Sequence, residues 1–278
     1  MKRNVYKRSY LCGDSVVKLG ERTLIMGILN VTPDSFSDGG RYNDTDRAVE
    51  HALQMMAEGA DMIDIGGEST RPGHTPVSEQ EEMQRIVPVI EAIHREAPHI
   101  PISIDTYKAN VAREALKAGG HIINDIWGFK EDPEMAKVAV EFDCPVILMH
   151  NRHDRNYNEL IEDVVNDLLE SVKIAKDAGV KAERIILDPG IGFAKDYTEN
   201  LKVMQSLDAL TTLGYPVLLA TSRKKFIRTA LNLDVDEVAF GTAATIAFGI
   251  AQGCQMVRVH DVKEMKLTAQ MCDAMYYA

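Results

Sequence analysis

The feature of the sequence that most constrains the fold is a regular alternation of short apolar runs with longer amphipathic stretches. It continues through nearly the whole chain of 278 residues. The apolar runs are rich in β-branched residues and predict strands, whereas the stretches between them have the period of helices. Eight strands are predicted, and they begin near Thr23, Met62, Ile102, Ile122, Pro145, Ile185, Pro216 and Met256.

A predicted helix follows each of these eight strands. The helices cover residues 45–58, 78–96, 108–118, 133–142, 157–178, 198–210, 236–252 and 262–276. Because a parallel strand needs a crossover before the next one, this repeat predicts a closed parallel barrel. An open, doubly wound parallel sheet is the alternative.

The first twenty residues do not follow the repeat. Residues 5–11 and 16–19 flank Cys12-Gly13-Asp14 and predict a β-hairpin within residues 1–20, placed to close the bottom of the barrel. No linker or low-complexity segment interrupts the rest of the chain. We therefore predict a single domain over residues 1–278.

Charge and composition exclude several classes of function. The formal net charge of −11 disfavours binding to nucleic acid and to anionic membrane surfaces. No apolar run approaches the roughly 20 residues that a membrane span needs. The four cysteines are scattered, without a C-x-x-C pair, so neither a disulfide framework nor a zinc knuckle is predicted. We predict a cytoplasmic protein.

Polar or ionisable residues follow every predicted strand. In a barrel the carboxyl ends of the strands meet at one face, which carries the chemistry. Carboxylate, amide and ammonium groups at that face predict a pocket for a heterocycle with alternating donors and acceptors, formed by Asp105, Asn124, Asp188 and Lys224. A second set predicts an anion site, formed by Asn30, Arg71, Arg258 and His260.

Other patterns carry less functional information. His150 and His153 have the spacing of metal ligands but lack a third partner, so zinc is not predicted. Three cations are predicted to be solvated surface charges, namely Lys195, Arg223 and Lys225. Residues 31–44 and 69–77 are rich in Gly, Pro, Ser, Thr and Asp and predict two mobile loops.

Seven ordered motifs resemble those of dihydropteroate synthase, the enzyme of folate biosynthesis that sulfonamides inhibit. They are GILNVTPDSFSDGG, IDIGGESTRPG, SIDTYKA, INDIWG, LDPGIGFAK, ATSRKKF and VRVHDV. The resemblance implies a (β/α)8 TIM barrel, usually homodimeric. It also implies a transferase that joins 6-hydroxymethyl-7,8-dihydropterin diphosphate to p-aminobenzoate and releases diphosphate with Mg²⁺ present.

The resemblance also assigns roles to residues of this sequence. The pterin would be bound by Asp105, Asn124, Ile126, Met149, Asp188 and Lys224. The diphosphate would be bound by Asn30, Thr70, Arg71, Arg258 and His260, with Asn30 also at the metal. The p-aminobenzoate would be bound by Phe36, Thr70, Pro72, Phe193, Ser222 and Lys225. Catalysis would involve Asp38, Asp105 and Lys224, and the two loops would shelter a pterin-stabilised cation from water.

One position departs from the family pattern. Lys225 stands where many relatives carry Ser, so it either meets the p-aminobenzoate carboxylate or is solvated.

Two other functions are alternatives. A pterin-dependent methyltransferase would not need the long first loop or the pair formed by Arg258 and His260. A pterin-binding protein without catalysis could keep Asp188 and Lys224 but lose loop or anion residues.

Overall fold

A closed parallel barrel forms the centre of the molecule. The structure, a computed structural model, describes residues 4–32, 41–69 and 76–276. Its eight parallel strands are β3 (Leu24–Asn30), β4 (Met62–Gly66), β5 (Ile102–Asp105), β6 (Ile122–Asp125), β7 (Val146–Met149), β8 (Ile185–Asp188), β9 (Leu218–Leu219) and β10 (Met256–Val259). Their order is β8-β7-β6-β5-β4-β3-β10-β9. A parallel bridge between Leu187 and Val217 joins β8 to the segment before β9, which closes the ring. The predicted barrel is confirmed, and the open sheet is wrong.

The strands are apolar on both faces because both faces are buried. Along β3, Ile25 and Leu29 face the layer of helices, whereas Leu24 and Met26 belong to a second cluster inside the barrel. This alternation follows from the two-residue period of a strand. The short apolar runs of the sequence therefore build two layers of core.

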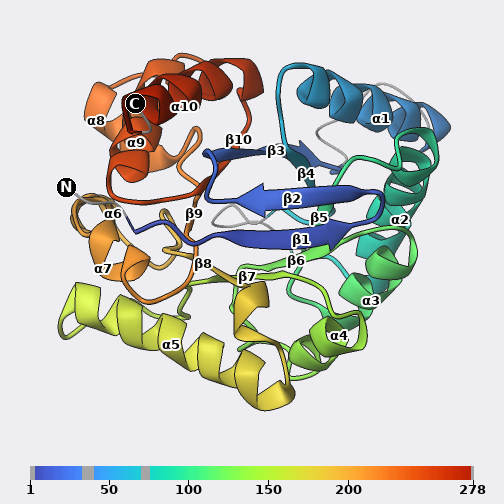
Figure 1. Cartoon of the computed structure of the whole chain (residues 1–278), viewed down its shortest axis with the longest axis horizontal. Coiled ribbons are helices and arrows are strands. Elements are labelled where there is room, and N and C mark those ends of the chain that lie inside the picture. The colour runs from blue at the N-terminus through green and yellow to red at the C-terminus, as the bar shows by residue number, and fades with distance from the viewer. Residues whose placement is uncertain (1–3, 33–40, 70–75, 277–278) are drawn as a thin grey trace.

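Helices surround the barrel (Figure 1). They are α1 (Arg41–Ala57), α2 (Glu79–Glu96), α3 (Ala109–Lys117), α4 (Met135–Glu141), α5 (Leu160–Ala178), α6 (Tyr197–Gln205), α7 (Leu207–Thr211), α8 (Lys225–Leu231), α9 (Ala239–Ala251) and α10 (Val262–Tyr276). A 3-10 turn, Ala182–Arg184, precedes β8. Within the described ranges, no helix has the length and apolar character needed to cross a membrane.

The helices of the structure differ from the prediction in two places. The stretch 198–210 is divided at Ser206, which ends α6 and begins α7 with φ −119° and ψ 25°. The short helix α8 was not predicted and lies between β9 and α9. Because α8 begins directly after Lys224, this lysine lies at the junction between the strand and the helix.

The N-terminal hairpin covers one end of the barrel, as predicted. Strands β1 (Arg8–Cys12) and β2 (Ser15–Leu19) pair antiparallel, and Figure 1 shows them lying across the barrel. Tyr10 and Leu19 are buried in the same cluster as the inward side chains of the barrel. The hairpin thus closes the amino ends of the strands and leaves the carboxyl ends for a site.

Candidate active site

The register of the parallel strands places the predicted site residues at the same height along the barrel. Asn30, at the end of β3, pairs with Gly66, which pairs in turn with Asp105 at the end of β5. Asp105 is the register partner of Asn124, and across the barrel Met149 is the partner of Asp188. The structure therefore collects these residues at the carboxyl face, as the sequence predicted.

A buried ionic network connects four strands of the barrel. Arg258 on β10 donates from Nε to the Asp64 carboxylate at 2.5 Å and from Nη2 to the Asp105 carboxylate at 2.7 Å. Asn124 Nδ2 donates to both Asp64 oxygens, at 3.3 and 3.2 Å. Asp64 lies within β4 and is fully buried, so its charge is tolerated only because these donors surround it.

Asp105 combines a raised pKa with an unused acceptor. Burial raises its pKa to about 7, against the opposing influence of the Arg258 guanidinium, while the nearby Asp64 charge raises it further. Its Oδ1 is buried and has no hydrogen-bond partner within the described part of the chain. A buried acceptor without a partner is costly, so a ligand that donates a hydrogen bond here would relieve that cost.

Asp188 and Lys224 form the opposite side of the pocket. Asp188 Oδ1 accepts the Gly190 N–H at 2.7 Å, and burial raises the pKa of this carboxyl despite the nearby Lys224 ammonium. Lys224 donates to the Ile191 carbonyl and lies 4.8 Å from the centre of the Phe193 ring. Burial lowers the pKa of Lys224 to about 8, although the Asp188 charge opposes this shift.

The segment after β8 needs its first glycine. Gly190 has φ +65°, a left-handed conformation that side chains rarely adopt. A Cβ at this position would also collide with the carbonyl oxygen of His150. The glycine therefore lets the chain turn directly under Asp188 and present the Gly190 N–H to it.

The remaining described site residues line the same face. Ile126 and Met149 are buried at the ends of β6 and β7. Ser222 Oγ meets both the backbone N–H of His260, at 3.1 Å, and its Nδ1, at 3.0 Å. Lys225 is exposed at the first position of α8. The five other predicted residues lie outside the described ranges, namely Phe36, Asp38, Thr70, Arg71 and Pro72, and their roles stay predictions.

Comparison with known proteins decides the family. A family model described as "Pterin binding enzyme" matches residues 26–260. Dihydropteroate synthase from Bacillus subtilis is 61% identical over 94% of this chain and 91% of the relative. The enzyme of the same name from Clostridium beijerinckii is 58% identical over 94% of this chain and 97% of the relative. The chain belongs to the dihydropteroate synthase family.

Solved structures of dihydropteroate synthases agree in fold. The enzyme from Clostridium difficile, solved in the presence of pteroic acid, has a TM-score of 0.91 and 50% identity, covering 93% of this chain and 98% of that one. The enzyme from Xanthomonas albilineans, solved with 4-aminobenzoic acid, has a TM-score of 0.93 and 36% identity, covering 98% of this chain and 100% of that one.

The sequence predicted that Lys195 and Arg223 are solvated surface charges, and the structure places the two differently. Lys195 is buried, with 8% of its surface exposed, and its Nζ lies 2.7 Å from Nδ1 of His150. Arg223 is half-buried, and its Nε and Nη2 both donate to Asp261, at 3.1 and 2.5 Å. For Lys195 the prediction was wrong, because His150 and the carbonyls of Gly190 and Phe193 surround its ammonium inside the protein. Arg223 keeps about one-third of its side chain exposed and is held by an ion pair with Asp261.

Four residues around the pocket were missed or misassigned in the sequence. Asp64 was missed, although a carboxylate inside the apolar run MIDIG was a visible signal. His150 is not paired with His153: its Nε2 lies 3.0 Å from Asp167, whereas the His153 ring stacks on Trp127 at 4.3 Å. Asp167 and Lys195 carried no signal, because solvated helix positions and loop ends commonly hold such residues.

Proposed function

We propose that this chain catalyses the reaction of its family. The C–O bond between the pterin methylene and diphosphate breaks, a C–N bond forms to the amino group of p-aminobenzoate, and that nitrogen loses a proton. The products are 7,8-dihydropteroate and diphosphate. The observation that carries the proposal is the meeting of carboxylate, amide and ammonium groups at one mouth, where Asp105 Oδ1 lacks a partner among the described residues.

The pterin ring matches these groups in hydrogen-bonding character. Carboxylates accept, so Asp105 and Asp188 suit the N–H edges of the ring, while the Lys224 ammonium suits its carbonyl or ring nitrogen. Ile126 and Met149 supply apolar walls. Negative charge from Asp105 and Asp188 would also favour the cation that forms when diphosphate departs.

The diphosphate and the second substrate would occupy the outer part of the mouth. Arg258 and His260, from the end of β10, would bind the diphosphate. Asn30 offers an amide oxygen at the partly exposed end of β3, which fits Mg²⁺, since this ion commonly takes one or two protein oxygens together with substrate phosphates. When bound, Mg²⁺ would neutralise charge on the leaving diphosphate. Phe193 and Ser222 would line the p-aminobenzoate site.

The reaction is tested by measuring diphosphate release from 6-hydroxymethyl-7,8-dihydropterin diphosphate, with and without p-aminobenzoate and with and without Mg²⁺. We expect release that depends on both and chromatographic recovery of dihydropteroate. Pterin binding without turnover would instead favour a silent binding protein or, if a methylated folate is consumed, a methyltransferase. Turnover that survives chelation of Mg²⁺ would contradict the metal proposal alone.

The pKa of Lys224 predicts an alkaline limit of activity. Burial lowers this pKa to about 8, so the ammonium that donates to the pterin is lost as the pH rises through that value. We expect kcat/KM for the pterin diphosphate to fall above about pH 8. The measurement is the pH profile of kcat/KM.

The control for this profile is Lys224→Arg, because a guanidinium does not titrate in this range. The variant should be less active, since its fork does not match the ammonium geometry, but its profile should lack the alkaline limb. An unchanged limb in the variant would assign it to another group.

We also propose that the protein forms homodimers through α9 and α10. Leu267, Met271 and Met275 follow each other at four-residue spacing on α10 and are 61–62% exposed, and Phe240 on α9 is 90% exposed. A stripe of large apolar side chains on adjacent helices favours association with the same surface of a second copy.

A cytoplasmic location is supported by the four free, buried cysteines, because disulfides are rare in that compartment.

Sedimentation velocity of Met271→Glu tests the dimer. We expect the wild-type protein to sediment as a dimer and the variant to shift to the monomer, because a carboxylate would be buried in the interface. The control is Leu169→Glu on α5, where a 40% exposed leucine is replaced on a different side of the barrel (Figure 1). A monomeric wild-type protein at micromolar concentration would contradict the proposal.

A further inference from the structure

We propose that Lys195 is a positioning residue that fixes the turn 190–193 beside the bound substrates. It is itself held by a hydrogen-bonded chain, called the relay below, that runs from Lys195 through His150 to Asp167. The inference rests on the proposed function, because it assigns the relay a part in the same reaction.

All three N–H groups of the Lys195 ammonium have acceptors. Its Nζ donates to the carbonyls of Gly190 and Phe193, each at 3.1 Å, and to Nδ1 of His150 at 2.7 Å. The segment after β8 belongs to no strand or helix, so few backbone donors reach its carbonyls and side-chain donors take their place. Lys195 supplies two of them from a single atom and thereby fixes both ends of the turn.

The turn that Lys195 holds contacts two residues proposed to bind the pterin. Its first residue, Gly190, donates to Asp188 at 2.7 Å, and the carbonyl of its second residue, Ile191, accepts from Lys224. The Phe193 N–H closes the turn on the Gly190 carbonyl at 3.1 Å. A shift of this turn would therefore move the partners of Asp188 and Lys224 together with the Phe193 ring.

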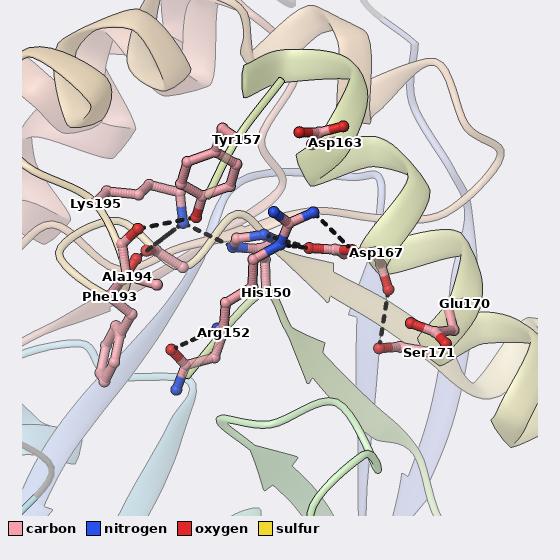
Figure 2. Close-up of polar contacts among 12 residues, drawn as sticks. His150, Arg152, Tyr157, Asp163, Asp167, Glu170, Ser171, Phe193, Ala194 and Lys195 are labelled. Atoms are coloured by element: carbon pink, nitrogen blue, oxygen red, sulfur yellow. Dashed lines mark hydrogen bonds and ion pairs between the residues drawn. The ribbon is translucent and has the colours of Figure 1, made fainter. Parts of the chain in front are cut away.

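The outer half of the relay sets the orientation of the His150 ring. Because Lys195 donates to Nδ1, the proton of a neutral imidazole lies on Nε2 and is donated to Asp167, whose Oδ2 is 3.0 Å away. Figure 2 shows His150 between Lys195 and Asp167, with Asp167 on a helix outside the barrel. Arg152 holds the same carboxylate, from Nε at 2.5 Å and from Nη2 at 3.2 Å.

The charge states agree with this geometry. Burial lowers the pKa of His150 to about 4, although the hydrogen bond to Asp167 opposes the shift, so the ring is neutral at physiological pH. Burial raises the pKa of the Asp167 carboxyl, but the hydrogen bonds from His150 and Arg152 more than offset this and leave the pKa well below its usual range. Burial lowers the pKa of Lys195 to about 7, although the Asp188 charge opposes the shift. Below about pH 7 the relay is therefore an anion, a neutral ring and a cation in series, each oriented by its neighbour.

The first test removes the donor. Lys195→Met keeps most of the side-chain volume but leaves the Phe193 carbonyl and His150 Nδ1 without their buried donor. We expect kcat/KM for p-aminobenzoate to fall about 10–100-fold, since a displacement of about 1 Å in a positioning group has effects of this size. Steady-state kinetics and thermal unfolding are measured on the same preparations.

The second test separates hydrogen bonding from packing. In His150→Gln, the amide can accept from Lys195 through oxygen and donate to Asp167 through nitrogen, whereas His150→Leu can do neither. We expect Gln to restore most of the activity that Leu loses. His121→Leu is the matched control: this partly buried histidine lies before β6, at the hairpin end, and accepts from Ile102 N–H at 3.1 Å. It should lose stability without losing kcat/KM.

A readout independent of activity follows the imidazole. ¹⁵N NMR of the wild-type protein should show a neutral His150 protonated on Nε2 at pH 6, and Lys195→Met should change that signal. Wild-type kinetics in Lys195→Met, or equal losses in the Gln and Leu variants, would overturn the proposal. An inactive wild-type protein would refute the proposed function, and the NMR result would then decide the relay by itself.

Discussion

Replacement of Arg258 by methionine is expected to lower the free energy of unfolding by about 3–5 kcal/mol and to abolish turnover. The guanidinium is largely buried and pairs with two carboxylates, Asp64 at 2.5 Å and Asp105 at 2.7 Å. Methionine fills a similar volume but leaves both carboxylates buried beside each other without a cation. Denaturant unfolding, with the midpoint and slope fitted separately, measures the loss.

The double variant Asp64→Asn/Arg258→Met provides the control. Neutralising Asp64 removes one of the two unpaired buried charges, so we expect the double variant to be more stable than Arg258→Met alone. Turnover should stay lost, because Arg258, the proposed partner of the diphosphate, is absent from both variants. The two effects should be strongly non-additive, as expected of residues in direct contact. A double variant no more stable than the single one would mean that the network contributes no net stability through this pair.

Much of the fold could be predicted because it depends on local patterns. The apolar runs at Met62 and Ile102 begin strands at those residues, since a strand buried on both faces needs a continuous apolar segment. The division at Ser206 was not predictable in this way, because apolar residues keep the helical period on both sides of it. The polar strand ends were informative as a group, since barrel topology converts eight positions in sequence into one face.

The charged residues show where sequence reasoning fails. Lysine and arginine are typical of surface positions. Only the fold brings His150 to Lys195 and Asp261 to Arg223. Whether a cation is solvated or buried depends on partners distant in sequence. Asp64 is bound by Arg258, which is 194 positions away, so no local window contains the interaction that allows its burial.

Replacement of Asp188 by asparagine is expected to weaken pterin binding by about 2–4 kcal/mol. One carboxylate oxygen already accepts the Gly190 N–H, so the other is left for the donors of the pterin edge. Asparagine would either present its NH₂ group to those donors or rotate and oppose the Gly190 N–H instead. Loss of the Asp188 charge would also lower the pKa of Lys224 further, because that charge now raises it.

Calorimetry with the pterin diphosphate and denaturant unfolding, measured together, distinguish a binding role from a structural one for Asp188. Burial raises the pKa of this carboxyl, which means that the fold disfavours its ionised form; a neutral amide should therefore leave stability unchanged or slightly raise it. Asp143→Asn, at an exposed carboxylate paired with Lys181 and Arg184, is the control and should leave affinity intact. Wild-type affinity in Asp188→Asn would remove this residue from the pterin site, whereas equal losses of affinity and stability would make it a support of the segment after β8. A large loss of affinity without a loss of stability is the result expected if the Asp188 carboxylate serves to bind the pterin.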